Sequence, residues 1–253
     1  MVQKRNTQSR RRAIVEKVIA FQEVSVEQLK EEFNTSEVTI RKDLSALEAN
    51  GLLLRKYGGA VALPTESSEL TDTEVSKRKQ AIGQAAASLI KDHNRIVIDS
   101  GSTTSALLNH ADQVRGLVVM TNSISVANRL LELESEPTLL MTGGTWDSQS
   151  HSFQGQFAEN TLRAYNFDQA FLGASGLDVA RGTTTFNELT NLSRTMAEVS
   201  QQVIVMAESE KLDRKIPNLE LAWEHIDVLV TDADIDKDSE QKITAQNVQI
   251  IKV

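Results

Sequence analysis

The first residues suited to chemistry are basic and hydroxyl side chains on one predicted helix, residues 37–50. On that helix Ile40, Leu44 and Leu47 share one side, which anchors it to a core. The other side and its flank carry groups that suit base edges in a DNA major groove, namely Val38, Thr39, Arg41, Lys42 and Ser45. The same spacing also fits a solvated basic face on a packing domain, so both interpretations stay open on spacing alone.

Polar groups around this helix suit contacts with DNA phosphates. Ser25 and Ser36 stand at two predicted helix starts, where a hydroxyl and a backbone N–H can bind a phosphate. Further basic and aromatic candidates flank the helices: Arg10, Arg11, Arg12, Arg55, Lys56 and Tyr57. These groups could grip the DNA backbone if the helix lies in a major groove, and on these residues alone the choice between the two interpretations stays open.

A second group of candidates follows predicted strands further along the chain. Asp99 ends a strand, and the small residues after it open a helix, where backbone N–H groups and hydroxyls can surround an anion. These and similar turns after other strands contain Gly101, Ser102, Thr103, Thr104, Thr121, Asn122, Ser123, Gly143, Gly144 and Gly173. One such turn is more often an ordinary helix cap. Because ligands in α/β sheets bind at the carboxyl ends of strands, their repetition predicts a phosphate-binding site.

Four acid–base candidates leave a second function open. Asp99, Asp178, Glu188 and Lys211 would serve a sugar-phosphate isomerase or deaminase, and a sensor would use the same groups to recognise hydroxyls and phosphate. The chain has no Gly-Lys-Ser/Thr phosphate loop and no GxGxxG after its first predicted strand, which disfavours nucleotide chemistry. The four histidines lack ligand spacing, so we expect no metal and no cofactor.

The predicted elements that position these N-terminal side chains are three helices and a hairpin, the arrangement of a winged helix-turn-helix. Apolar periodicity predicts helices over residues 10–21, 26–33 and 37–50, with Ser25 and Gln28 forming a capping box. Residues 52–56 and 60–63 predict a hairpin, the wing, around Gly58 and Gly59. The polar stretch 64–73 predicts a linker.

Beyond the linker, buried-type strand patterns alternate with helical stretches. The predicted strands are residues 95–99, 117–121, 138–142, 168–173, 203–207, 227–231 and 248–253. This alternation predicts an α/β domain with a mostly parallel sheet and flanking helices. The expected domains are a DNA-binding head at 1–60, a linker at 61–74 and an effector-binding domain at 75–253.

Composition supports this division. The 253 residues are 40% apolar, lack cysteine and carry a net charge of -8. Residues 1–60 hold 11 Lys or Arg against 8 Asp or Glu, whereas residues 61–253 hold 16 against 27. A basic head precedes an acidic body, and the head can still bind phosphates because salt screens exposed charges over about 8 Å. Without an apolar run long enough to span a membrane, a soluble, cytoplasmic protein is expected.

Residues 10–60 resemble the winged helix-turn-helix of the DeoR family of bacterial repressors. The resemblance rests on SVEQL at 25–29, TSEVTIRKDL at 35–44 and RKYGGA at 55–60. It implies that Thr39, Arg41 and Lys42 contact DNA directly. Many relatives have arginine at the positions of both Arg41 and Lys42. A lysine at position 42 keeps the positive charge but cannot donate two hydrogen bonds in the planar geometry of arginine, so Lys42 is expected to contact a phosphate.

The rest of the chain resembles the DeoR-family effector domain, which is similar in fold to ribose-5-phosphate isomerase and glucosamine-6-phosphate deaminase. The matching residues include DSGST at 99–103, TNS at 121–123, FLG at 171–173, GTTTFNE at 182–188 and Lys211. The resemblance implies that Gly101 to Thr104 and Lys211 hold a phosphate. It also implies that the polyol end is lined by Asp99, Asn122, Asp178, Thr184, Thr185 and Glu188. Residues 153–160 and 186–188 look closest to the glucitol-operon type of repressor.

Together these features predict a repressor of a carbohydrate operon that a phosphorylated sugar or sugar alcohol releases from operator DNA. One head reads too few base pairs for specificity, so a homo-oligomer, dimer or tetramer, is expected, with no membrane partner. The alternative is an isomerase- or deaminase-like enzyme that carries an accessory DNA-binding head.

Overall fold

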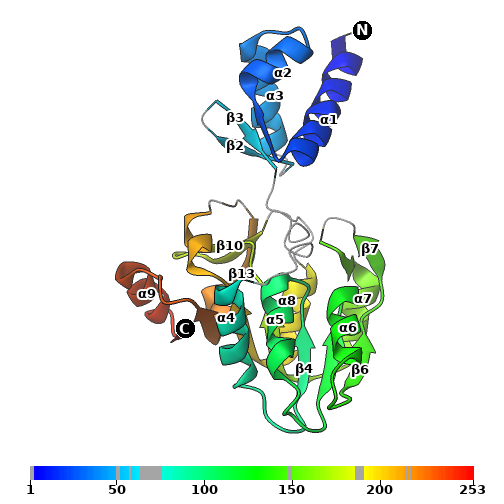
Figure 1. The fold of residues 1–253 in the computed structure, drawn as a ribbon, viewed down its shortest axis with the longest axis vertical. Helices are drawn as coiled ribbons and strands as arrows, with labels where there is room; N and C mark the ends of the chain where they lie inside the picture. The colour runs from blue at the N-terminus through cyan, green and yellow to red at the C-terminus, as the bar shows by residue number, and fades with distance from the viewer. Residues whose placement is uncertain are drawn as a thin grey trace. The chain divides into compact units, whose positions relative to one another are not determined.

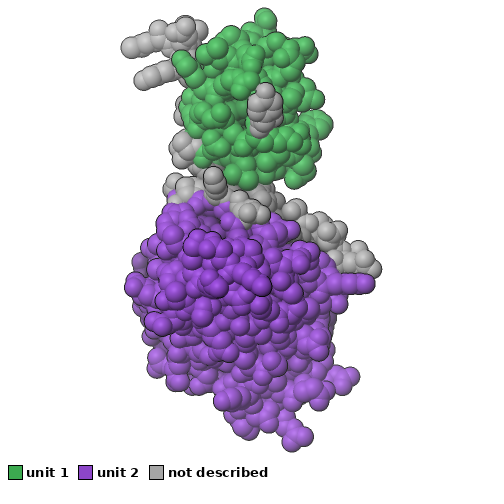
Figure 2. Space-filling model, turned by 90° about the vertical axis from the view of Figure 1, so that its left-hand side faces the viewer, with its two compact units in different colours: residues 1–65 green, residues 66–253 purple. Residues whose placement is uncertain are grey.

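The computed structural model describes residues 3–49, 52–56, 58–62, 76–147, 150–185, 191–214, 216 and 218–253. The chain divides into two compact units, residues 1–65 and 66–253, which we call the head and the body (Figure 2). The predicted linker at 61–74 falls mostly outside the described residues. Among the helices of the described ranges, none combines the length and the apolar character that crossing a membrane requires.

The head consists of three helices and a small antiparallel sheet (Figure 1). The helices are α1 (Gln3–Phe21), α2 (Val26–Glu32) and α3 (Glu37–Ala49). The strands β1 (Glu23–Ser25), β3 (Gly59–Val61) and β2 (Leu54–Lys56) pair in that order, so the predicted wing hairpin is confirmed and gains a third strand. The capping box is also confirmed, because Ser25 Oγ accepts from Gln28 N at 3.1 Å and Gln28 Oε1 accepts from Ser25 N at 2.9 Å.

A buried carboxylate joins α3 to α1. Asp43 is 2% exposed and its two oxygens accept from Arg10 Nε at 2.7 Å and from Arg11 Nε at 2.8 Å. Ile40 and Leu44 lie on the same buried side of α3 and pack with Ile14 of α1. The head therefore fixes its helices through an ion-pair cluster as well as through apolar contacts.

The body is built on a seven-stranded parallel sheet in the order β15-β14-β12-β9-β4-β5-β6. The strands are β4 (Arg95–Ile98), β5 (Val118–Thr121), β6 (Thr138–Met141), β9 (Phe167–Leu172), β12 (Ser200–Met206), β14 (Val228–Thr231) and β15 (Gln249–Lys252). All seven predicted strands are confirmed. The chain runs outward from β4 to β6 and then returns to β9 on the other side of β4. The strand order thus reverses between β4 and β9, the place where such sheets bind ligands.

Both faces of this sheet are covered, as alternation along β4 shows. Ile96 and Ile98 pack into one cluster with α4 (Lys77–Ala87) and α6 (Ile124–Leu131). Val97 points to the other face and packs with α7 (Gln156–Arg163), α8 (Asn191–Glu198) and α9 (Lys237–Thr244). Helices on both faces give the three-layer arrangement in Figure 1.

Short elements complete the body, and of these the sequence predicted only the helix that opens after Asp99, α5. β10 (Gly176–Asp178), β11 (Gly182–Thr185) and β13 (Asn218–Ala222) form an antiparallel sheet, and β7 (Thr145–Asp147) pairs with β8 (Ser152–Gln154). Single-turn helices are α5 (Ser102–Ala106), η2 (Leu107–His110), η3 (Ser209–Asp213) and η4 (Trp223–His225). Gly182 has φ +134°, and a Cβ there would lie 1.9 Å from the Leu221 carbonyl oxygen, so this hairpin requires glycine.

Candidate DNA-binding and effector sites

The exposed side of α3 gathers the predicted base-reading residues. A shallow surface hollow is lined by Val38, Arg41, Lys42, Ser45 and Ala46. Val38 is 63% exposed, so its methyl groups are available on this face to meet a thymine methyl. Thr39 lies at the flank, and its backbone N–H donates to Ser36 Oγ at 3.2 Å, so Ser36 caps the helix as predicted. The sequence thus places one cationic face with an apolar group on a fixed helix.

The cations of this face have exposed partners. Arg41 donates to Glu37 Oε1 from Nε at 2.9 Å and from a terminal nitrogen at 2.6 Å. Arg55 of the wing donates to Ser45 Oγ and pairs with Glu48 at 3.5 Å, and Lys56 pairs with Glu23. Exposed pairs of this kind contribute little, so these cations can exchange a carboxylate for a phosphate.

The remaining predicted phosphate contacts differ in their surroundings. Arg10 is bound to Asp43 and its side chain is only 13% exposed, whereas that of Arg11 is 34% exposed. The structure therefore gives Arg10 a place in the head's packing. Tyr57 and the side chain of Arg12 lie outside the described residues.

In the body, the loop after β4 lies at the strand reversal. Asp99 accepts from the backbone N–H of Ser100 at 2.7 Å, and Gly101 stands before α5 with φ +148°. Ser102, Thr103 and Thr104 are all buried. Gly173, at the end of β9, faces this loop, because a Cβ there would lie 3.8 Å from Ser100 O and 3.9 Å from Thr104 Cγ2. The structure thus brings together the β4 and β9 turns that the sequence singled out.

Two buried lysines reach the same loops from different elements. Lys79, in the first turn of α4, is 8% exposed, and its Nζ donates to Ser102 Oγ at 3.1 Å. Lys211, in η3 after β12, is 6% exposed, and its Nζ donates to the Ala174 carbonyl at 2.7 Å. Sequence reasoning found Lys211 and missed Lys79. The missed signal was its position on the apolar side of α4, three residues before Ile82 and seven before Ala86.

Two buried polar side chains near this edge have hydrogen-bonding capacity to spare. Asn122, directly after β5, is 0% exposed; its amide N–H lies near the Asp99 carboxyl, while its Oδ1 has no hydrogen-bond partner within the described structure. Thr184 Oγ1 on β11 is also buried and has no hydrogen-bond partner within the described structure. Buried polar atoms are nearly always satisfied, so an orphaned amide oxygen is a feature of a site that accepts a polar ligand.

A pair of carboxyl groups adds an electrostatic signature. Burial raises the pKa of Asp99 to about 6, against the lowering effect of the Ser100 N–H and of the nearby Asn122 side chain. Burial and the charge of the neighbouring Asp99 together raise the pKa of Glu220 on β13 to about 7, against the lowering effect of the Ser193 hydroxyl, which donates to Glu220 at 2.7 Å. Sequence reasoning missed Glu220, which stands between Leu219 and Leu221 without any local motif.

Comparison with known families decides what these two sites belong to. The DeoR-like helix-turn-helix domain matches residues 10–66, and the DeoR C terminal sensor domain matches residues 74–233. The chain belongs to the DeoR family. Both family domains are thus present in the expected order.

Two relatives of this DeoR-family protein cover almost its whole length. It is 35% identical over 254 residues to a protein of Escherichia coli O157:H7 described as a putative aga operon transcriptional repressor, covering 98% of this chain and 94% of that protein. It is 33% identical over 247 residues to the HTH-type transcriptional regulator GlpR of Haloferax volcanii, covering 96% of each. The protein is accordingly a DNA-binding transcriptional repressor, and the alternative of an isomerase or deaminase is not supported.

Solved structures with a similar fold share little sequence identity with this chain. A probable sor operon regulator from Shigella flexneri gives a TM-score of 0.44 at 12% identity, over 68% of this chain and 89% of that one. A ribose 5-phosphate isomerase from Methanocaldococcus jannaschii gives 0.39 at 15% identity, over 53% and 52%. Likeness at this level adds nothing to the fold described above.

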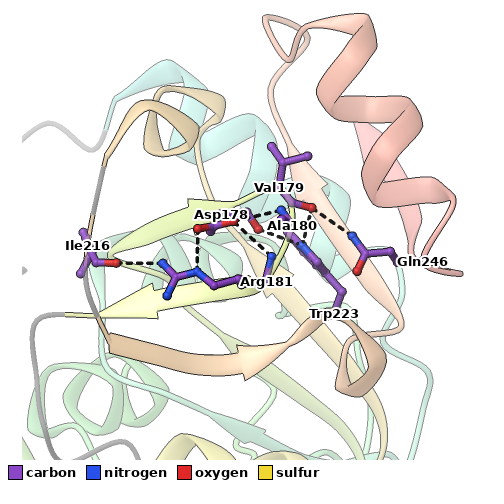
Figure 3. A network of polar contacts seen from close by, with 7 residues as sticks. All are labelled: Asp178, Val179, Ala180, Arg181, Ile216, Trp223 and Gln246. Carbon is purple, nitrogen blue, oxygen red and sulfur yellow. Dashed lines mark hydrogen bonds and ion pairs between the residues drawn. The ribbon is translucent and has the colours of Figure 1, made fainter.

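Asp178, a predicted polyol ligand of the DeoR-family protein, is instead tied into the β10–β11 turn (Figure 3). Its carboxylate accepts from Ala180 N at 2.9 Å and from Arg181 Nε at 2.7 Å. Burial would raise the pKa of Asp178, but these bonds outweigh it and lower the pKa. The backbone carbonyl of Asp178 accepts from Trp223 Nε1 at 2.9 Å. In this structure Asp178 therefore holds the β10–β11 turn, and its role as a polyol ligand stays a prediction.

The other predicted effector residues lie at several strand ends. Thr121 Oγ1 accepts from Ser123 N at 3.1 Å, and Ser123 Oγ caps α6 by accepting from Val126 N at 3.3 Å. Gly143 and Gly144 follow β6 with φ of +62° and +118°. Thr185 pairs with Asn218 in the small sheet. Glu188 lies outside the described residues.

Proposed function

We propose that this DeoR-family protein represses a carbohydrate-utilisation operon and leaves its operator when a phosphorylated sugar or sugar alcohol binds the body. The observation that carries the proposal is the pair of buried lysines at the strand reversal. Lys79 touches Ser102 of the β4 loop, and Lys211 touches Ala174 of the β9 loop. Two ammonium groups beside hydroxyls and backbone N–H groups suit a phosphate dianion.

The polyol end of such an effector would meet acceptors and donors on the neighbouring strands. Asn122 offers its amide oxygen and Thr184 offers its hydroxyl, neither of which has a hydrogen-bond partner among the described residues. Asp99 lies beside Asn122 and accepts hydrogen bonds when it is ionised. A chain of alternating donors and acceptors distinguishes a polyhydroxylated ligand from inorganic phosphate, because each hydroxyl can pair with one of them.

The same residues offer a route from the effector toward the DNA-binding head. Ser76, the first described residue after the predicted linker, caps α4 by accepting from Lys79 N at 3.2 Å and donates to Glu208 Oε1 at 3.1 Å. A phosphate on Lys79 would therefore act on the first turn of the helix that follows the linker. Reciprocity requires operator DNA to weaken effector binding by the same factor.

A charge-neutralising variant of Lys79 tests the proposal. Operator binding is measured by electrophoretic mobility shift on the DNA upstream of the protein's own gene, titrated with a panel of sugar and polyol phosphates. We expect one member of the panel to release the wild-type protein. Lys79→Gln should keep operator affinity and lose that release, because one of the two ammonium groups is gone.

Lys77→Gln provides the matched control, since it removes the same charge from an exposed position on the same helix. It should respond to the effector as the wild type does. Normal release of Lys79→Gln by the effector would remove this edge from the effector site. Operator binding that ignores every phosphate in the panel would overturn the sensor function itself.

A further inference from the structure

Two carboxyl groups of the body are surrounded by protein and form no ion pair with a described lysine, arginine or histidine. They belong to Asp99, directly after β4, and Glu220, on β13. Burial is the largest influence on the pKa of each carboxyl and raises it, yet both residues keep part of their surface accessible. Enclosed charges in proteins are normally paired, so these two groups lack a counter-charge that a ligand can supply.

The donors that Asp99 meets are uncharged. Its carboxylate accepts from the Ser100 N–H at 2.7 Å and from the Ser100 hydroxyl at 3.4 Å, and the amide N–H of Asn122 lies near it. An ionised carboxylate only accepts hydrogen bonds, so it holds the amide with the nitrogen toward itself. The Asn122 oxygen is thereby left as a buried acceptor that no donor of the described structure meets.

Glu220 has a similar environment, which it reaches from the small antiparallel sheet. Its carboxylate accepts from Ser193 Oγ at 2.7 Å and from Thr183 Oγ1 at 3.3 Å. The charge of Arg194 also reaches Glu220, but the guanidinium donates to two backbone carbonyls of β13, at 2.9 Å each, instead of to the carboxylate. The charge of Asp99 disfavours the ionisation of Glu220, so the two carboxyl groups are neighbours.

Another enclosed carboxylate of the body shows that this fold can supply a counter-charge. Glu159 on α7 is 8% exposed, and its carboxylate lies 3.4 Å from a guanidinium nitrogen of Arg163. Burial alone therefore does not explain why the other two carboxyls have no such partner among the described residues. We call Asp99, Glu220 and the amide oxygen of Asn122 the acceptor cluster. Its members lie together because Asp99 neighbours both of the others.

We propose that the effector is a phosphorylated amino sugar, whose amino group enters the acceptor cluster as an ammonium ion. An ammonium group has three N–H donors, and each of the three members of the cluster has an oxygen that can accept one. Contacts with the carboxylates would be charge-assisted, and the ligand would supply the missing positive charge. This inference rests on the proposed function, in which Lys79 and Lys211 hold the phosphate at the other end of the ligand.

The acceptor cluster lies within reach of the proposed phosphate site. Ser102, whose hydroxyl accepts from Lys79 Nζ at 3.1 Å, follows Asp99 by three positions. Three residues of chain span at most about 10 Å, so one small molecule can meet both groups. A hydroxyl in place of the ammonium would donate a single hydrogen bond and leave both carboxyls without a counter-charge. The site should therefore discriminate between an amine and a hydroxyl on otherwise identical ligands.

Isothermal titration calorimetry of the full chain, without DNA, tests this with matched ligands. The probes are the 6-phosphates of glucosamine, mannosamine and galactosamine, each beside the hexose 6-phosphate that has a hydroxyl in place of the amine. We expect at least one amino ligand to bind about tenfold more tightly than its hydroxyl counterpart. Its N-acetyl derivative, which lacks the charge, should lose this advantage. Equal affinity of amine and hydroxyl in every pair, or an N-acetyl derivative that binds as tightly as the amine, would overturn the inference.

Glu220→Gln separates the charge of the cluster from its shape. Glutamine keeps an oxygen that can accept from Ser193 and Thr183. The variant should lose the roughly tenfold preference for the amine and keep its affinity for the hydroxyl counterpart within about threefold. Glu224→Gln, which removes an exposed acid four positions further along, should leave both affinities unchanged. A preference for the amine that persists in Glu220→Gln would overturn the inference.

Proton release by the wild type gives a readout that needs no variant. A bound ammonium favours the ionised form of Asp99 and Glu220, whose pKa values are about 6 and about 7. At a pH of about 6.5 the amino ligand should therefore release on the order of one proton more than its hydroxyl counterpart, measured by titration in two buffers of different ionisation enthalpy. Equal proton release by both ligands would contradict the inference.

The outcomes for the effector class and for sensing itself can be told apart. Hydroxyl ligands that bind as tightly as their amino counterparts would overturn the inference and leave the proposed sensing function standing. Failure of every sugar phosphate in the set to bind, with amine or with hydroxyl, would count against both.

Discussion

The head and the body both carry cationic side chains at their proposed sites, but those of the head are exposed and those of the body are buried. In the head, Arg41 and Lys56 are exposed and each lies against an acidic neighbour on the surface. In the body, Lys79 and Lys211 are buried and donate to a hydroxyl and a carbonyl oxygen. Exposed cations change partners at little cost, which suits a long polyanion such as DNA. Buried ammonium groups are held in place, which suits a small anion of fixed shape.

Because of this difference in exposure, removing a charge should affect DNA binding in the head and stability in the body. In the head, removing an exposed charge weakens DNA binding and costs little stability. Asp43 differs from these groups because its carboxylate is buried. In the body, the titratable groups of the site are themselves part of the packing, so their protonation changes stability.

The largest effect is expected for Asp43→Ala, which turns the one deeply buried ion-pair cluster described in the head into unpaired charges. Arg10 and Arg11 would both lose the carboxylate that holds them. Breaking a buried pair from one side costs about 3 to 5 kcal/mol, comparable to the whole stability of a small domain. Calorimetry should show the head's transition lost or lowered and the body's transition unchanged. Glu37→Ala, which removes an exposed carboxylate, should leave both transitions in place.

The second prediction tests whether the exposed face of α3 reads bases. Arg41→Ala should cost about 1 to 3 kcal/mol of operator affinity and relax the preference at one base position, because a guanidinium that reads guanine makes two hydrogen bonds. Affinity is measured on the operator and on single-base variants of it. Glu37→Gln serves as the control, since it frees Arg41 from its surface partner. Uniform weakening of Arg41→Ala on all sequences would reduce Arg41 to a phosphate contact.

The third prediction concerns pH and the body. The pKa of Asp99 is raised to about 6 and that of Glu220 to about 7, so the folded body binds more protons than the unfolded chain between about pH 4 and pH 7. The stability from these groups is fully present below their unfolded pKa values and is lost as pH rises through about 6 to 7. Lowering the pH from 8 to 5 should therefore stabilise the body by on the order of 4 kcal/mol.

Denaturant unfolding of the body, followed by circular dichroism at each pH, checks this prediction. The double variant Asp99→Asn, Glu220→Gln should flatten the pH dependence, and Glu224→Gln, which changes an exposed acid, should leave it unchanged. The lowered pKa values of Asp178 and Asp232 act only below about pH 4, outside this range. Stability that rises from pH 5 to pH 8 would contradict the assignment.

The parts of the fold that the sequence predicted are those with strong local patterns. Parallel strands buried on both faces appear as continuous apolar runs, so all seven were found. The hairpin at Gly182 and the strand that carries Glu220 are short and half polar, and a loop would look the same. Lys79 lies in the stretch Lys77-Arg78-Lys79, where nothing in the neighbouring sequence distinguishes the buried Lys79 from the exposed Lys77 and Arg78. Its partner Ser102 is 23 positions away, and only the fold brings the two together.

The smallest effect is expected at Lys42, which is exposed on α3 beside Arg41. Lys42→Arg keeps the charge and adds a planar fork that can bind a guanine or a phosphate with two hydrogen bonds. If Lys42 contacts only a phosphate, operator affinity should change by less than about 1 kcal/mol, and the salt dependence should keep its slope because the number of neutralised phosphates is unchanged. A gain confined to one base position would show that this position faces a base edge and that lysine leaves a hydrogen bond there unmade.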